Sequence, residues 1–239
     1  MGFRDLLAFF TRLPVGKGDL LGAASSFYLV PLVGAVEGAI VSVVGYLVDM
    51  RSGPLMASLI MLAAHIVIGG SLHIDGLADY SDLWGSGARG ADAIKIIKDP
   101  RRGSFSIMVV SLALLARFVL FDYLVSSPVV VTASYVSGLE ASYVTALMGR
   151  REPYNGVAGP FVDSAKLRGH AVANAITYAV TLIALTAISP RAALTALAIL
   201  VSFLMYLDSS HRLGFVNGDV LGATIELSEL ASMVVGVIV

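Results

Sequence analysis

Long apolar stretches alternate with short polar connections along most of this chain. A helix needs about 20 mainly apolar residues to cross a membrane. Seven stretches come close to that length: residues 28–48, 55–72, 105–125, 129–148, 171–188, 192–207 and 220–239. Apolar runs of this length predict an all-α fold, a polytopic membrane bundle of about seven transmembrane helices.

The composition is that of a membrane protein. Hydrophobic residues make up 57% of the 239 residues and charged residues 14%, against roughly 45–50% and about 25% in soluble domains. A net charge of −1 argues against a nucleic-acid partner, and the absence of cysteine excludes disulfides, thiolate metal sites and cysteine nucleophiles. No internal repeat or linker divides the chain, so we expect a single integral-membrane catalytic domain over residues 1–239.

Lysine and arginine are distributed unevenly between the connections. With seven spans, thirteen of the sixteen basic residues fall on one side of the membrane and two on the other. Because basic residues favour the cytoplasmic side, we expect a multi-pass protein of the cell membrane with a cytoplasmic N-terminus. The polar segments described below then face the cytoplasm. The apolar N-terminal segment, flanked by Arg4 and Arg12, is interpreted as an amphipathic segment at that face rather than a cleaved signal peptide.

Three carboxylates follow the second apolar stretch at helical spacing. Asp75, Asp79 and Asp82 lie at positions i, i+4 and i+7, which places them on one face of a helix. Like charges so close together repel one another and are costly to desolvate near lipid, so a cation should lie among them. Mg²⁺ is the simplest candidate because it prefers oxygen ligands. The alternative is a helix end with solvated acids outside the membrane.

A basic segment follows about ten residues later. It contains Lys98, Asp99, Arg101, Arg102, Gly103 and Ser104. Such a segment can simply be the basic flank that fixes the orientation of a span. Beside an acidic metal site, however, it supplies what phosphoryl transfer needs, since cations stabilise the charge on the transferred group. Backbone N–H groups of Gly103 and Ser104, at the predicted start of a helix, could also bind a phosphate.

Further acids lie in the last span. Asp219, Glu226 and Glu229 share one helical face, after the polar turn at Asn217. Acids inside a membrane helix are usually functional, although each glutamate could instead form an interhelical hydrogen bond. Arg117, in the third predicted span, is a candidate partner for one of them. The loop at residues 150–169 contains glycine and proline, which predicts irregular backbone that could cover a substrate.

Three motifs resemble one family in register. Residues 73–82 (HIDGLADYSD) resemble the HxDGLADxxD signature of cobalamin synthase, the adenosylcobinamide-GDP ribazoletransferase family. Residues 97–105 (IKDPRRGSF) are similar to that family's basic segment, and residues 218–226 (GDVLGATIE) are similar to its C-terminal element. These matches cover the middle and the end of the chain, and the N-terminal segments also fit the family's pattern.

The resemblance implies the last step of cobalamin assembly. A hydroxyl of α-ribazole, or of its 5′-phosphate, attacks the cobinamide-linked phosphate of adenosylcobinamide-GDP, and GMP leaves; the family requires Mg²⁺. It further implies that Asp75, Asp79 and Asp82 hold the metal. Either Asp82 or Asp219 would accept the hydroxyl proton. Neutralisation of the phosphates and of the leaving GMP is assigned to Lys98, Arg101 and Arg102. Substrate binding is assigned to His73, Asp99, Gly103, Ser104, Asn217 and Glu226.

Two other functions fit parts of the pattern. A membrane phosphotransferase of the CDP-alcohol type also uses an aspartate face, but its DGxxAR signature does not match Asp75-Gly-Leu-Ala-Asp79. A cation-coupled transporter would also place acids in helices, but it would carry polar residues on both sides of the membrane. The expected partners are therefore a corrinoid nucleotide and α-ribazole. The sequence leaves open whether the chain forms a homo-oligomer.

Overall fold

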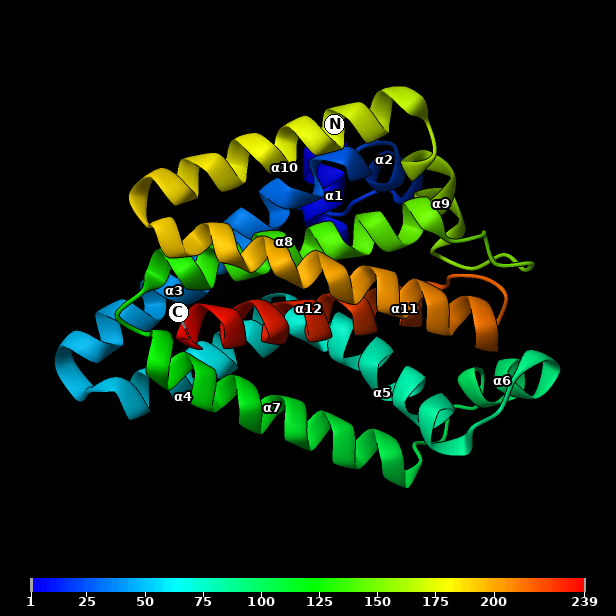
Figure 1. Ribbon diagram of the computed structural model, residues 1–239, viewed down its shortest axis with the longest axis horizontal. Helices are drawn as coiled ribbons and strands as arrows, with labels where there is room; N and C mark the ends of the chain where they lie inside the picture. The colour runs from blue at the N-terminus through cyan, green and yellow to red at the C-terminus, as the bar shows by residue number, and fades with distance from the viewer. Residues whose placement is uncertain (1, 239) are drawn as a thin grey trace.

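The computed structural model describes residues 2–238, and most of them are helical (Figure 1). Within these residues no strand forms beyond one isolated bridge, between Arg151 and Val216. The helices run as follows: α1 Gly2–Phe10, α2 Leu20–Ser25, η1 Phe27–Leu29, α3 Val30–Ser52, α4 Pro54–His65, η2 Ile66–Gly70, α5 Ser71–Ser86, α6 Gly90–Ile97, α7 Ser104–Leu124, α8 Pro128–Met148, α9 Gly159–Ala165, α10 Arg168–Ile188, η3 Pro190–Ala198, α11 Ile199–Arg212 and α12 Gly218–Ile238. The predicted all-α class is confirmed.

Five helices of the described chain are long and apolar enough to cross a membrane. They are η1 with α3, then α7, α10, η3 with α11, and α12. A sixth crossing would result if α4 and α5 form one bent span. A multi-pass membrane protein is thus confirmed, whereas the count of seven spans and the cytoplasmic N-terminus stay predictions.

Helix α8, which covers the predicted span at 129–148, is not one of these five. It occupies the middle of the bundle, and sixteen of its 21 residues are buried. Gly34 and Gly38 of α3 let the two backbones approach closely, because a Cβ at either position would overlap the α8 backbone. Since protein rather than lipid surrounds α8, its polar side chains find hydrogen-bond partners on neighbouring helices. Glu140, for example, accepts a hydrogen bond from Nδ2 of Asn174 at 2.9 Å. Outer helix α10, by contrast, buries only Asn174 among its own residues.

The predicted span at 55–72 is interrupted. Helix α4 passes into the π-helical turn η2, and α5 leaves at 86° to α4. A Cβ at Gly69 would overlap the Glu37 side chain, so a larger residue at the bend would displace Glu37. The carbonyl oxygen of Ile68 accepts the backbone N–H of Arg12 at 2.6 Å. Glycines and π-helical turns are common causes of such breaks, and this one directs the aspartate helix along a new axis.

The N-terminal segment forms a short amphipathic helix, as the sequence predicts. Helix α1 buries Leu6, Leu7 and Phe10 and packs on α2. Burial of these three side chains attaches α1 to the bundle by the hydrophobic effect. The segment between α1 and α2 then runs beside the bend after α4. The hydrogen bond from the Arg12 N–H to the Ile68 carbonyl holds the segment in this position.

The polar segments gather at one end of the bundle. The last turns of α5, helix α6, the loop before α9 and the connection from α11 to α12 all lie at the right of Figure 1. Backbone pairing joins two of them, because the N–H of Val216 donates to the carbonyl of Arg150 at 2.9 Å. The segments that the sequence assigned to one membrane face are therefore neighbours in space.

Candidate active site

Helices α5 and α12 cross at two glycines. A Cβ on Gly76 would lie 3.0 Å from the carbonyl oxygen of Asp219 and 3.1 Å from the Cα of Gly222. The backbones can approach this closely only because neither glycine carries a side chain at the crossing. Asp75, next to Gly76, and Asp219 consequently line the same cavity.

The start of α12 is held by its own polar residues. Asn217 Oδ1 accepts the N–H of Val220 at 3.1 Å, in the manner of an N-cap residue. Its Nδ2 donates to a carboxylate oxygen of Asp219 at 2.7 Å. Asn217 is buried, so it orients the Asp219 carboxylate at the end of the helix rather than facing solvent.

Arg102 supplies the cation that the aspartates of α5 require. Its guanidinium forms ion pairs with Asp75 and with Asp79. The Asp75 side chain is 61% exposed and that of Asp79 is 17% exposed, so the pair lies at the edge of the bundle. The acidic and basic motifs, predicted to work together, are in direct contact here.

The third aspartate has different partners. Asp82 accepts the backbone N–H of Gly103 at 2.7 Å and that of Ser106 at 3.0 Å. Both oxygens of its carboxylate thus bind free N–H groups at the start of α7, where a negative charge is favourable. The N–H of Gly103, predicted to bind phosphate, is taken by Asp82 in this structure. Ser104 is exposed at the first position of α7.

The rest of the basic segment reaches toward solvent and the loop before α9. Arg101, whose side chain is 88% exposed, binds Asp99 through Nε at 2.9 Å and Nη2 at 2.7 Å. This hydrogen-bonded ion pair lowers the pKa of Asp99 to about 2. Lys98 takes another direction, with its Nζ 3.7 Å from the centre of the Tyr154 ring. That distance is typical of a cation–π interaction.

Two residues of the loop before α9 were missed by the sequence analysis. The Tyr154 hydroxyl lies 3.5 Å from Asn217 Nδ2, so Tyr154 connects Lys98 to the start of α12. Glu152 is buried and accepts the N–H of Gly159 at 3.0 Å. Burial raises the pKa of Glu152. The hydrogen bonds that its carboxylate accepts from backbone N–H groups lower the pKa and so offset part of this rise. The glycines and prolines of this loop predicted irregular backbone, but no motif marked these side chains.

Glu226 and Glu229 belong to a buried ionic cluster. Arg117 binds Glu226 at 2.7 Å and Glu229 at 2.8 Å, and all three side chains are at most 2% exposed. The predicted pairing of Arg117 with an acid is confirmed, and it involves both glutamates. His65 Nε2 lies 3.4 Å from Glu226, and its Nδ1 lies 2.9 Å from the Tyr135 hydroxyl. Arg117 thus pairs with both glutamates inside the bundle, while the substrate role of Glu226 stays a prediction.

Among the described residues, three side chains of that same cluster lie close enough to share one metal ion. Ligand atoms of His65, Glu226 and Glu229 lie within 4.8 Å of one another. Arg117 already occupies one carboxylate oxygen of each glutamate there. The α5 aspartates are less enclosed, with the Asp75 side chain 61% and the Asp79 side chain 17% exposed, but the ligand atoms of Asp75, Asp79 and Asp82 do not all come within 4.8 Å of one another.

A cavity of about 260 Å³ opens beside Asp75 and Asp219. Three phenylalanines line it: Phe9, Phe10 and Phe161. His73 also lines it; the side chain is 3% exposed, and Nε2 has no hydrogen-bond partner among the described residues. His73, which the family resemblance assigns to substrate binding, thus lies at this cavity.

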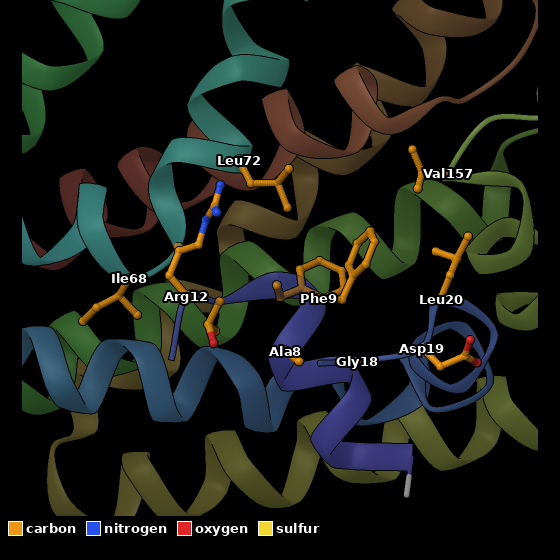
Figure 2. Close-up of a pocket in the computed structure, with 12 residues that line it drawn as sticks. Ala8, Phe9, Arg12, Gly18, Asp19, Leu20, Ile68, Leu72 and Val157 are labelled. Carbon is orange, nitrogen blue, oxygen red and sulfur yellow. The ribbon is translucent and has the colours of Figure 1, made fainter. Parts of the chain in front are cut away.

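A second cavity of about 350 Å³ adjoins the first. Both are bordered by Phe9, Leu72 and Val157. Figure 2 shows the side chain of Arg12 extending toward Leu72 on the side opposite Leu20 and Asp19. Residues of α1 and of the segment after it are the second group that the sequence analysis missed. The amphipathic pattern of α1 was the signal, since its apolar face forms these walls.

Known proteins of one kind match nearly the whole chain. The family model described as cobalamin-5-phosphate synthase matches residues 2–237. A protein of Chlorobium chlorochromatii named adenosylcobinamide-GDP ribazoletransferase is 31% identical over 98% of this chain and 95% of its own length. Proteins of the same name from Pseudomonas syringae pv. syringae and Chlorobaculum parvum are each 32% identical, over 92% and 96% of this chain and 90% and 92% of their own.

No solved structure matches the chain. The family model and these relatives nevertheless span the bundle together with the α5 aspartates, the basic segment and the start of α12. This chain belongs to the cobalamin-5-phosphate synthase family.

Proposed function

We propose that this protein catalyses the final step of cobalamin biosynthesis, the joining of adenosylcobinamide-GDP to α-ribazole or its 5′-phosphate. A hydroxyl oxygen of the ribazole forms a bond to the cobinamide-linked phosphorus. The bond from that phosphorus to GMP breaks, and GMP leaves while the hydroxyl proton passes to a base. Family membership supports this transferase over the CDP-alcohol phosphotransferase and the cation-coupled transporter.

One contact in particular supports a location for this reaction in the structure. Arg102, from the basic segment, lies between Asp75 and Asp79 of the HIDGLADYSD segment. Phosphoryl transfer needs cations at the phosphates and carboxylates for a metal or a proton within one site. Lys98, Arg101 and Arg102 would neutralise the diphosphate and the departing GMP.

Asp75 and Asp79 would hold Mg²⁺. Their oxygen atoms suit a hard divalent cation, and they already share one positive charge in Arg102. Bound there, Mg²⁺ would neutralise charge on the diphosphate. Arg102, whose side chain is 39% exposed, has room to turn from the carboxylates to a phosphate. Asp82 would join as a ligand only by releasing a backbone N–H of α7.

Asp219 is the better candidate for the general base. Both oxygens of Asp82 accept N–H groups from the start of α7, which holds that carboxylate away from a substrate hydroxyl. Asp219 lines the cavity beside Asp75, and one oxygen accepts a hydrogen bond from Asn217. A carboxylate oriented by a neighbour and open to a cavity meets the geometric requirement for proton transfer.

We further propose that this end of the bundle faces the cytoplasm of the cell. Thirteen of the sixteen basic residues belong to connections on the same side as the aspartates, in the seven-span arrangement. The corrinoid nucleotide and the ribazole would then enter from the cytoplasm and from the adjoining membrane surface.

The experiment is a release assay with purified protein in liposomes. Adenosylcobinamide-GDP, α-ribazole and Mg²⁺ should give GMP and one corrinoid product whose mass equals the sum of the substrates less GMP. No GMP release from protein whose fold is verified by circular dichroism would refute the proposed reaction.

A further inference from the structure

We propose that the cavity of about 260 Å³ beneath α1 binds the flat aromatic base of the acceptor nucleoside. This inference rests on the proposed function and adds which part of which substrate enters the cavity. The walls come from α1, α5, α9 and α12, so the cavity exists only in the folded bundle.

Aromatic rings form much of the wall. The Phe9 and Phe161 ring centres lie 4.8 Å apart, and the Phe10 and Phe161 centres lie 5.8 Å apart with the rings at 87°. The three rings therefore form one aromatic cluster, and aromatic rings favour edge-to-face or offset-stacked contacts with a further flat ring. An apolar bicyclic base would bury its faces among them.

His73 gives this apolar wall one polar position. Its ring centre lies 5.9 Å from that of Phe10, and its buried Nε2 has no partner among the described residues. A buried polar atom without a hydrogen bond is costly, and a ligand that supplied a partner for it would remove that cost. The base of α-ribazole, a benzimidazole, carries a single free ring nitrogen that can accept one hydrogen bond. A single acceptor in an otherwise apolar ring matches a single buried imidazole nitrogen.

The lining of the cavity fits the acceptor nucleoside better than the other substrate groups. Asp75 and Asp219 can accept hydrogen bonds from ribose hydroxyls, whereas the diphosphate would bind the Mg²⁺ proposed at Asp75 and Asp79, outside the phenylalanine wall. Guanine carries several donors and acceptors that the phenylalanines would leave unpaired. A corrin macrocycle is also too large, since pockets for drug-sized ligands have volumes of about 300–1,000 Å³. The base in the cavity would therefore direct a ribose hydroxyl toward Asp219.

The test compares two changes in the wall with a matched control. Val157→Trp adds a bulky ring at the border of the cavity, and Phe9→Ala removes an aromatic wall. Leu167→Trp is the control, because Leu167 is 54% exposed, as Val157 is, and lies outside this wall. Binding of α-ribazole alone is measured by equilibrium dialysis, and the KM is measured for each substrate.

Both wall variants should weaken α-ribazole binding and raise its KM by roughly tenfold or more, the usual loss when an aromatic contact to a base is removed. The KM for adenosylcobinamide-GDP should stay within about twofold, and the control should match the wild type. A raised KM for the corrinoid nucleotide alone, or no change in α-ribazole binding, overturns the proposal. Absence of GMP release from wild-type protein that binds α-ribazole would instead refute the reaction, not this cavity.

Discussion

Gly76 of α5 packs directly against Gly222 of α12. This contact brings the helix that carries Asp75 and Asp79 against the helix that begins with Asp219. Motifs more than a hundred residues apart in the chain thereby share one site. The geometry of the proposed reaction depends on this crossing, because a small separation of the helices moves the carboxylates apart.

Gly76→Val should reduce activity strongly. A Cβ at this position already lies 3.0 Å from backbone atoms of α12, so two further methyl groups would force the helices apart. Overpacking of this kind costs about 1–3 kcal/mol of stability. Gly169→Val serves as the control, since nothing lies within 4 Å of a Cβ there. GMP release and the thermal unfolding midpoint should both fall for Gly76→Val, and a Gly76→Val variant with unchanged turnover would contradict the role of the crossing.

Arg102→Met should separate metal binding from turnover. Without the guanidinium, Asp75 and Asp79 lose their positive partner, so Mn²⁺ used as a probe for Mg²⁺ should bind more tightly. Turnover should nevertheless fall by roughly 10²–10³, because a group that stabilises the transferred charge is missing.

Electron paramagnetic resonance of Mn²⁺ measures the first effect, and GMP release measures the second. Arg101→Met is the control, since Arg101 pairs only with Asp99 among the described residues and should leave Mn²⁺ affinity near that of the wild type. Equal Mn²⁺ affinity in wild type and Arg102→Met would count against a metal at these aspartates.

Arg117→Met should destabilise the bundle. The change leaves Glu226 and Glu229 buried without their cation, and removal of one partner from a buried ion pair costs about 3–5 kcal/mol. Combining Arg117→Met with Glu226→Gln and Glu229→Gln should recover part of that loss, because the uncompensated charges disappear. Thermal unfolding in detergent measures both variants, and equal midpoints for wild type and Arg117→Met would mean that the cluster is not ionic.

Glu152→Gln should change how stability depends on pH. Burial raises the pKa of Glu152, so the folded protein holds this proton more tightly than the unfolded chain does. The favourable contribution of Glu152 is therefore fully present below the ordinary glutamate pKa of about 4.3 and is lost as the pH rises through the raised value.

The difference in unfolding midpoint between wild type and Glu152→Gln should accordingly shift in favour of the wild type as the pH falls from 7 toward about 4. Glutamine keeps an oxygen that can accept the N–H of Gly159, so the loop should remain folded. A pH-independent difference would show that Glu152 has an ordinary pKa.

The helices could be predicted from the sequence because they depend on the local spacing of apolar residues. The contact between the α5 aspartates and the basic segment could be predicted because the two motifs carry opposite charges and are close in the chain. Apolar length predicted the outer helices, and the i, i+4, i+7 spacing placed the aspartates on one face of α5. Arg117 could be assigned to the glutamates because an arginine inside a membrane helix needs an anionic partner.

Features that depend on tertiary packing could not be predicted in this way. The bend after His65 arises where Glu37, from another helix, packs against Gly69. Central helix α8 has the length of a span but is buried among the other helices, and its apolar pattern did not show that it lies in the middle of the bundle. Asp82 caps a helix that begins more than twenty residues later, and no local pattern distinguishes it from Asp75 and Asp79.

Turnover by the Asp79→Asn variant tests the central claim most directly. The change removes one negative charge with little change in volume, so the fold and membrane insertion should persist. With adenosylcobinamide-GDP, α-ribazole and Mg²⁺ in liposomes, the wild type should release GMP, and Asp79→Asn should be slower by roughly 10²-fold or more. GMP release by Asp79→Asn at the wild-type rate would contradict the assignment of the reaction to the aspartate face of α5.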